Sequence, residues 1–119
     1  MKTFLIILSL VLISGFIRFY QLADNPPALN WDEVSHGYNA YSILKTGSDE
    51  WGEFLPITNF RAYGDYPLPL YMYLSMPGIL LFDLNEFSIR LPSALLGTFL
   101  VVIVYLLTLI IVRSKYLAY

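Results

Sequence analysis

The stretch Leu91–Val112, LPSALLGTFLVVIVYLLTLIIV, contains no charged residue and is followed at once by Arg113. About 20 apolar residues, each rising about 1.5 Å, cross the hydrocarbon core of a bilayer. Pro92 falls in the first turn of the predicted helix, where a missing amide costs little. The sequence therefore predicts a transmembrane helix here.

A second apolar stretch opens the chain. Thr3–Ile17 carries no charge and continues through Arg18 into two aromatic residues. A long basic side chain can reach the headgroups there while the aromatic rings lie at the interface. We therefore predict a membrane anchor over 1–22. The alternative is a cleaved signal peptide with Lys2 as its basic start, but no small-residue cleavage pattern follows the apolar run.

Composition places the chain among membrane proteins. Hydrophobic residues make up 57% of it and charged residues 13%, against about 45–50% and about 25% in soluble domains. A net charge of −2 with no basic run argues against nucleic acid as a partner. The absence of cysteine excludes a disulfide framework, a thiolate metal site and a cysteine nucleophile.

The charges predict the orientation of the two spans. All nine acidic residues lie between Asp24 and Glu86, and the loop 23–90 contains only three basic residues. Basic residues flank the outer ends of both spans, at Lys2 and Arg113. The positive-inside rule then places both termini in the cytoplasm and the loop outside the cell membrane.

The loop is rich in aromatic residues and predicts two further helices. Val34, Tyr38 and Tyr41 recur at helical spacing, and Gly47 suits the left-handed position that ends a helix. The apolar run 67–82 is short for a span, and Pro77 is expected to break a helix there. We predict that both segments lie in the membrane interface.

The predicted fold class is thus an all-α membrane protein with two transmembrane helices joined by an extracytoplasmic loop that carries two interfacial helices. The expected segments are transmembrane helix 1–22, loop 23–66 with an interfacial helix at about 33–45, interfacial or re-entrant helix 67–83, transmembrane helix 88–113, and cytoplasmic tail 114–119.

Acidic residues supply the candidate catalytic groups. Asp32 precedes the predicted helix, so it can serve as an N-cap or as a general base that takes the proton of an attacking hydroxyl. Glu33 in the first turn complements the helix dipole. Asp65 stands before the second interfacial helix and suits a turn, a helix cap or, paired with Asp32, a divalent metal.

Three further residues are candidates on weaker grounds. His36 follows Asp32 by four positions, one helical turn, but the chain has no histidine and cysteine cluster that would complete a metal site. Arg61 and Arg90 can each bind a phosphate through a planar guanidinium, or can simply balance charge in an acidic loop, which we favour for Arg90.

The order of these pieces resembles the N-terminal part of GT-C glycosyltransferases of glycosyltransferase family 39, the protein O-mannosyltransferase and aminoarabinose-transferase type. The first span ends in Gly-Phe-Ile-Arg-Phe-Tyr, and Trp-Asp-Glu follows with Gly-Tyr and Ala after it. The later matching blocks are Asp65–Tyr71, DYPLPLY, and Asn85–Leu95, NEFSIRLPSAL, of which Ser88–Ser93 is the most specific.

The resemblance implies an enzyme that moves a sugar from a polyprenyl- or dolichyl-phosphate donor to a hydroxyl of a protein or glycan acceptor, with inversion. It implies catalytic roles for Asp32 and Glu33, with Asp32 as the base. It also implies that Asp65 binds substrate or a metal ion. With Arg61, predicted from its guanidinium, and Tyr66 beside Asp65, the predicted substrate-binding residues are Asp65, Arg61 and Tyr66. Tyr66 stands where the family usually has Lys or Pro.

Family members have roughly a dozen spans, so the resemblance predicts that a chain of two spans is an incomplete and inactive fragment. The alternative is a non-catalytic two-span membrane protein whose aromatic loop binds lipid headgroups, glycans or a partner subunit. A reading frame that ends naturally at Tyr119 would favour that alternative.

Overall fold

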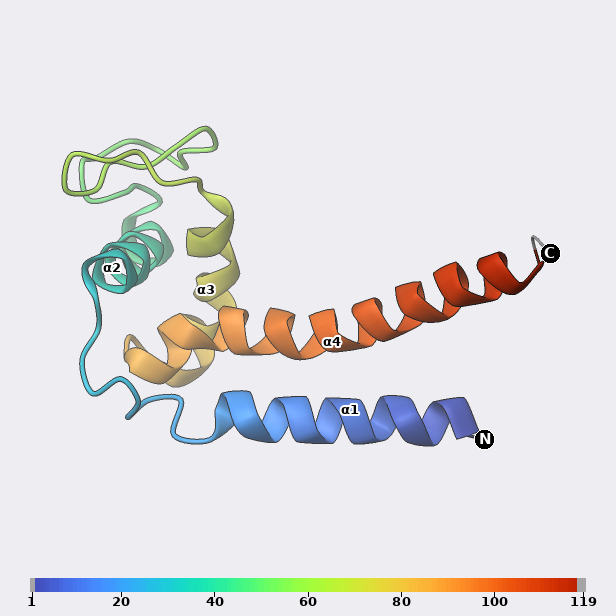
Figure 1. The fold of residues 1–119 in the computed structure, drawn as a ribbon. Coiled ribbons are helices and arrows are strands. Elements are labelled where there is room, and N and C mark those ends of the chain that lie inside the picture. The colour runs from blue at the N-terminus through green and yellow to red at the C-terminus, as the bar shows by residue number, and fades with distance from the viewer. Residues whose placement is uncertain (1, 118–119) are drawn as a thin grey trace. The chain divides into compact units, whose positions relative to one another are not determined.

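The computed structural model describes residues 2–117, with side chains as far as residue 112, and contains only helices and irregular segments within that range (Figure 1). The chain divides into two compact units, one formed by residues 1–20 with 93–119 and the other by Gln21–Pro92. The helices are α1 (Lys2–Phe19), α2 (Trp31–Thr46), α3 (Leu70–Phe82) and α4 (Glu86–Leu117).

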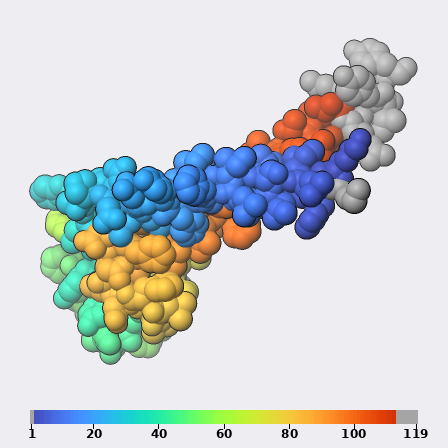
Figure 2. All heavy atoms as spheres, turned by 90° about the horizontal axis from the view of Figure 1, so that it is seen from below, coloured from blue at the N-terminus to red at the C-terminus, as the bar shows by residue number. Residues whose placement is uncertain are grey.

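Among the described residues, two helices are long and apolar enough to cross a membrane, Lys2–Phe19 and Glu86–Val112. The first unit contains the former and the part of the latter that follows Pro92. Both expose many large apolar side chains, and those of α1 are open to view along the helix in Figure 2. Exposed apolar surface on this scale belongs in lipid or against other helices. Residues 118–119 of the predicted tail, and the side chains of its other residues and of Arg113, lie outside the described part.

Small side chains bring α1 and the later part of α4 together in this unit. A methyl group added at Gly97 would lie 2.5 Å from Nε of Arg18, so the arginine side chain rests directly on the glycine. Nη1 of Arg18 also donates to Oγ of Ser14, at 2.7 Å. The arginine therefore stays within the helix pair.

The second unit is built around α2 and α3, which pack against each other. Its buried core consists of Ala40, Ile43, Phe60, Met72 and Ile79. The loop after α2 is tied to it by Asn39, whose side chain donates to Oε1 of Glu50 at 3.1 Å and accepts from the Glu50 amide. The predicted glycine end of this helix is confirmed, since Gly47 has φ 77° and donates to Ile43 O.

The inward face of α2 differs from the predicted aromatic stripe. Val34 and Tyr38 are exposed, and the buried positions are mostly small or polar, namely Ser35, Gly37, Asn39, Ala40 and Ile43. Ile89 lies directly against Gly37, where no side chain would fit. The small residues of α2, which let a large apolar neighbour approach the helix backbone, therefore decide which face is buried.

Two prolines lie inside helices, Pro77 where a break was predicted and Pro92 deeper in its helix than predicted. Helix α3 continues through Pro77, because the core contacts on either side of the proline outweigh one lost amide bond. Helix α4 begins earlier than predicted because Asn85 Oδ1 accepts from Ser88 N at 2.9 Å, so Pro92 lies beyond the first turn. Pro92 therefore offers no amide to Ser88 O.

Gly78 of α3 lies against that carbonyl. A methyl group at Gly78 would come within 2.8 Å of Ser88 O, which is backbone and cannot move aside easily. We expect Gly78→Ala to lower the free energy of unfolding by about 1–3 kcal/mol through overpacking. Thermal unfolding in detergent, followed by tryptophan fluorescence, measures this.

The matched control is Gly15→Ala, because a methyl group there would meet only Thr98 Cγ2 at 3.9 Å, an ordinary contact. We expect this variant to be as stable as the parent or slightly more stable, since Ala favours helix over Gly by about 1 kcal/mol. Equal losses in the two variants would contradict the close contact at Gly78.

Candidate functional site

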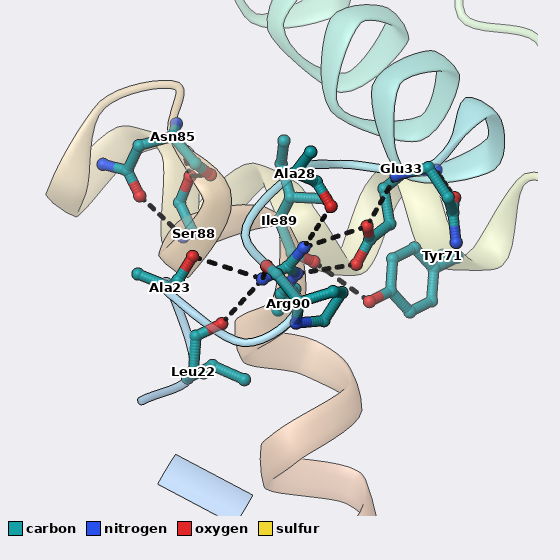
Figure 3. Close-up of polar contacts among 11 residues, drawn as sticks. Leu22, Ala23, Ala28, Glu33, Tyr71, Asn85, Ser88, Ile89 and Arg90 are labelled. Carbon is teal, nitrogen blue, oxygen red and sulfur yellow. Dashed lines mark hydrogen bonds and ion pairs between the residues drawn. The ribbon is translucent and has the colours of Figure 1, made fainter. Parts of the chain in front are cut away.

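Arg90 is the centre of the polar structure in the second unit (Figure 3). Its side chain is only 5% exposed. Nε donates to Oε1 of Glu33 at 2.7 Å, and Nη2 donates to Oε2 of Glu33 at 3.2 Å. This two-point contact uses the planar geometry that a guanidinium shares with a carboxylate.

The remaining donors of Arg90 hold the segment that follows α1. Nη1 donates to the backbone oxygens of Leu22, Ala23 and Pro26 at 3.0, 3.3 and 2.9 Å, and Nη2 donates to Ala28 O at 3.0 Å. These residues are far from Arg90 in sequence, and none of them has regular secondary structure that would pair its carbonyl. The buried guanidinium thus fixes the conformation of residues 22–28, which lead into α2. We call these contacts, together with those to Glu33, the arginine clamp.

A capping box starts α2. Asn30 Oδ1 accepts from the Glu33 amide at 2.8 Å, and Glu33 Oε2 accepts from the Asn30 amide at 3.0 Å. Glu33 is therefore bound from both sides, by Asn30 and by Arg90. The hydrogen bonds from Arg90 hold the pKa of the Glu33 carboxyl below its ordinary value, against the opposing effect of burial.

Of the two roles predicted for Asp32, N-cap and general base, the structure excludes the N-cap. Asn30, not Asp32, is the N-cap, because α2 begins two residues earlier than predicted. Asp32 lies in the first helical turn with an exposed side chain, and its carboxylate takes part in no hydrogen bond to another described residue. The capping role is therefore wrong, and the carboxylate remains available to an incoming group.

One turn further along α2, His36 packs on Tyr71 of α3, with the ring centroids 5.1 Å apart. Burial lowers the pKa of His36, and the charges of Asp32 and Glu33 oppose this shift without cancelling it. The Tyr71 hydroxyl donates to Ile89 O at 3.0 Å. His36 thus connects the acidic start of α2 to α3.

The other predicted residues gather at a tight hairpin. Ala62 and Asp65 exchange both backbone hydrogen bonds, at 3.0 and 2.7 Å, across a two-residue turn. Tyr63 and Gly64 both have positive φ, 50° and 89°, as in a type I′ turn. A tyrosine in this conformation costs about 1–3 kcal/mol, and residues under such strain cluster at functional sites.

A shallow pocket of about 240 Å³ opens beside the hairpin. Arg61 and Trp51 form one wall, since Arg61 Cζ lies 5.5 Å from the ring centroid of Trp51 and the indole Nε1 donates to Arg61 O at 3.2 Å. The lining comprises Trp51, Arg61, Ala62, Tyr63, Gly64, Asp65 and Tyr66. The structure thus brings Arg61, Asp65 and Tyr66 together.

The hairpin also meets the start of α2, because the rings of Trp31 and Tyr63 pack edge to face with centroids 5.4 Å apart. No group of three or more His, Cys, Asp or Glu side chains suited to a metal occurs among the described residues. Asp65 is accompanied in its pocket by a guanidinium rather than by a second carboxylate. These residues alone do not fit a metal site.

Sequence reasoning missed two features of this region. It treated Arg90 as charge balance, although the arginine lies in the most specific block of the family resemblance. It also overlooked Trp51 and Tyr63 as pocket residues. The one local sequence signal was Gly64, which suits the second position of a two-residue hairpin turn.

The described residues contain helices and irregular segments alone, and two of the helices are long and apolar enough to cross a membrane, which is the architecture of an all-α membrane protein. Comparison with known families then identifies it further. The family model of dolichyl-phosphate-mannose-protein mannosyltransferases matches residues 8–119. The chain belongs to this family.

One relative is an uncharacterized protein of Aquifex aeolicus (strain VF5), which is 36% identical over 116 residues. The aligned region covers 97% of this chain and 21% of the relative, so the chain spans about a fifth of that protein's length. No solved structure matches the chain.

The contacts of Arg90 predict a large difference between two arginines of the second unit, Arg90 in α4 and Arg61 in the segment between α2 and α3. Arg90→Ala leaves Glu33 and four carbonyl oxygens without their donor, and we expect a loss of about 3–5 kcal/mol in the free energy of unfolding. The matched control is Arg61→Ala, which removes an exposed arginine and is expected to cost less than about 1 kcal/mol. Chemical denaturation in detergent compares them; similar losses would contradict the clamp.

The lowered pKa values predict acid sensitivity in two steps. The unfolded chain binds a proton more readily than the folded chain at both His36 and Glu33, so stability falls as pH drops below 6.5, the ordinary pKa of histidine, and again below 4.5, that of glutamate. Melting temperature as a function of pH measures this. His36→Phe keeps a ring against Tyr71 and should remove the upper step alone; an unchanged upper step would assign it to another group.

Proposed function

We propose that this chain is the N-terminal part of an integral-membrane glycosyltransferase that moves a sugar from a polyprenyl-phosphate donor to a hydroxyl acceptor. Membership of the mannosyltransferase family supports the class of reaction. The acceptor is a protein or glycan hydroxyl, and the donor a polyprenyl- or dolichyl-phosphate sugar. Both termini lie in the cytoplasm, and the loop 23–90 faces the other side of the membrane.

Asp32 is the general base of the proposed reaction. The acceptor hydroxyl attacks the anomeric carbon from the side opposite the lipid phosphate, and its proton passes to the Asp32 carboxylate as the new bond forms. The bond between the anomeric carbon and the phosphate oxygen breaks, and the lipid phosphate leaves with the electron pair. Attack from the opposite side inverts the anomeric centre.

The observation that carries this assignment is the difference between two adjacent carboxylates. Glu33 is held by Arg90 and Asn30, and its lone pairs are used in those contacts. Asp32 is exposed on a helix turn fixed by the same contacts. A base must be held rigidly and must also remain accessible to substrate. The contacts of Glu33 with Arg90 and Asn30 hold the helix turn that carries Asp32, and the exposure of Asp32 leaves it accessible. Glu33 accordingly acts by positioning.

Arg61, Asp65 and Tyr66 form the proposed substrate subsite beside this base. They line one pocket, and the contact between Trp31 and Tyr63 connects the pocket to the residue directly before Asp32. Donor and acceptor are expected to meet between α2 and the hairpin.

The test is Asp32→Asn in the full-length enzyme, with transfer from a polyprenyl-phosphate sugar as the readout. We expect the turnover rate to fall by about 10²–10⁴-fold, the usual contribution of a general base, with little change in melting temperature because Asp32 is not the N-cap. Asp24→Asn, an exposed aspartate outside the site, is the matched control. Undiminished turnover in Asp32→Asn would rule out this base.

A non-catalytic role as a binding protein for lipid headgroups, glycans or a partner subunit is the second candidate. The exposed aromatic side chains of the hairpin region, among them Trp31, Trp51 and Tyr63, favour it. Binding of lipid headgroups or glycans by the parent full-length protein, without any transfer activity, would support that alternative.

A further inference from the structure

We propose that the pocket between Trp51 and the 62–65 hairpin is a carbohydrate subsite that holds one neutral pyranose ring. The inference rests on the proposed function, because it names what Arg61, Asp65 and Tyr66 bind, and it adds Trp51 and Tyr63 as the stacking surfaces. It concerns binding alone and includes no chemical step.

The pocket combines the two kinds of group that a sugar ring requires. A pyranose has faces of C–H groups, which carry partial positive charge and are attracted to the electron-rich face of an aromatic ring. Its edge carries hydroxyls that both donate and accept hydrogen bonds. Trp51 and Tyr63 are 61% and 65% exposed, and the polar groups of Arg61, Asp65 and Tyr66 line the same hollow.

The aromatic surfaces are held in place before any ligand arrives. The indole of Trp51 is fixed at its nitrogen by Arg61 O and lies beside the Arg61 guanidinium. Tyr63 is fixed by the turn and by its edge-to-face contact with Trp31. Large exposed rings that are already ordered lose little conformational freedom on binding, which favours ligand contact.

Charge selects a neutral ligand. Arg61 is the one cation and Asp65 the one anion in the described lining, so the pocket has no net charge. A phosphate or carboxylate beside Arg61 would also face Asp65. A pair of vicinal hydroxyls, in contrast, can donate to the carboxylate and accept from the guanidinium at the same time.

Asp65 and Arg61 both have polar atoms that remain available to a ligand, which agrees with a neutral sugar. Within the described part of the chain, Asp65 Oδ1 accepts only from the Tyr66 amide, at 2.7 Å, and Arg61 forms no ion pair. A volume of about 240 Å³ is below the range of about 300–1,000 Å³ typical of drug-sized ligands. The pocket therefore suits a single ring, either a residue of an acceptor glycan or the sugar of the donor lipid.

Saturation-transfer NMR on the full-length protein in nanodiscs tests the inference, with methyl α-D-mannopyranoside and methyl β-D-glucopyranoside as probes. We expect saturable binding of at least one probe, and association about tenfold weaker in Trp51→Ala and in Asp65→Asn. Asp65→Asn keeps the acceptor for the Tyr66 amide, so it separates lost recognition from lost folding, and melting temperature checks both variants. Tyr38→Ala removes an exposed ring of α2 outside the pocket and is expected to bind as the parent does.

Competition identifies the source of the ring. Displacement of the probe by a polyprenyl-phosphate sugar, but not by polyprenyl phosphate alone, would assign the pocket to the donor sugar. Simultaneous binding of probe and donor would assign it to an acceptor glycan. Either result supports the subsite.

The proposal is overturned if neither probe binds, or if Trp51→Ala and Asp65→Asn bind the probe as tightly as the parent. Because these measurements require no turnover, they are independent of the Asp32→Asn result. If Asp32→Asn loses transfer as expected but the parent protein binds neither probe, the transferase assignment stands and only the carbohydrate subsite is rejected.

Discussion

The buried contact between Arg90 and Glu33 is the constraint on which the second unit depends. A guanidinium that is removed from water must find a partner for each donor, and this one finds a carboxylate and four backbone oxygens. The same carboxylate closes the capping box that begins α2. These contacts connect the first residues of α4, the irregular segment before α2 and the start of α2. The position of the exposed Asp32 is fixed by this connected structure.

This arrangement separates two adjacent acids by role. Glu33 and Asp32 are neighbours in sequence and point from the same helical turn, but one is used in structure and the other is left accessible. An enzyme site needs both kinds of group, since a reacting carboxylate is useful only when its backbone is held firmly. The hairpin adds a second rigid element, because its turn and the contact between Tyr63 and Trp31 fix aromatic rings that remain exposed.

Much of the fold could be predicted from sequence, because it depends on strong local signals. The uncharged run Leu91–Val112 by itself predicts an apolar helix of membrane length, and Gly47 by itself predicts the end of α2. The inward face of α2 could not be predicted, since Gly37 is buried by its fit to Ile89 and not by hydrophobicity. Arg90 likewise satisfies carbonyl groups more than sixty residues away, and no local pattern reports such a contact.

The distance in sequence between Arg90 and its partners affects the order of events during biosynthesis. Leu22 O and Arg90 Nη1 are separated by 68 positions, and forming contacts between such distant residues requires closing a long loop. The segment after α1 is translated early, and water is the donor to its carbonyls until Arg90 can replace it. These contacts can therefore form only after Arg90 has been translated, so the segment before α2 reaches its final conformation together with the first turns of α4.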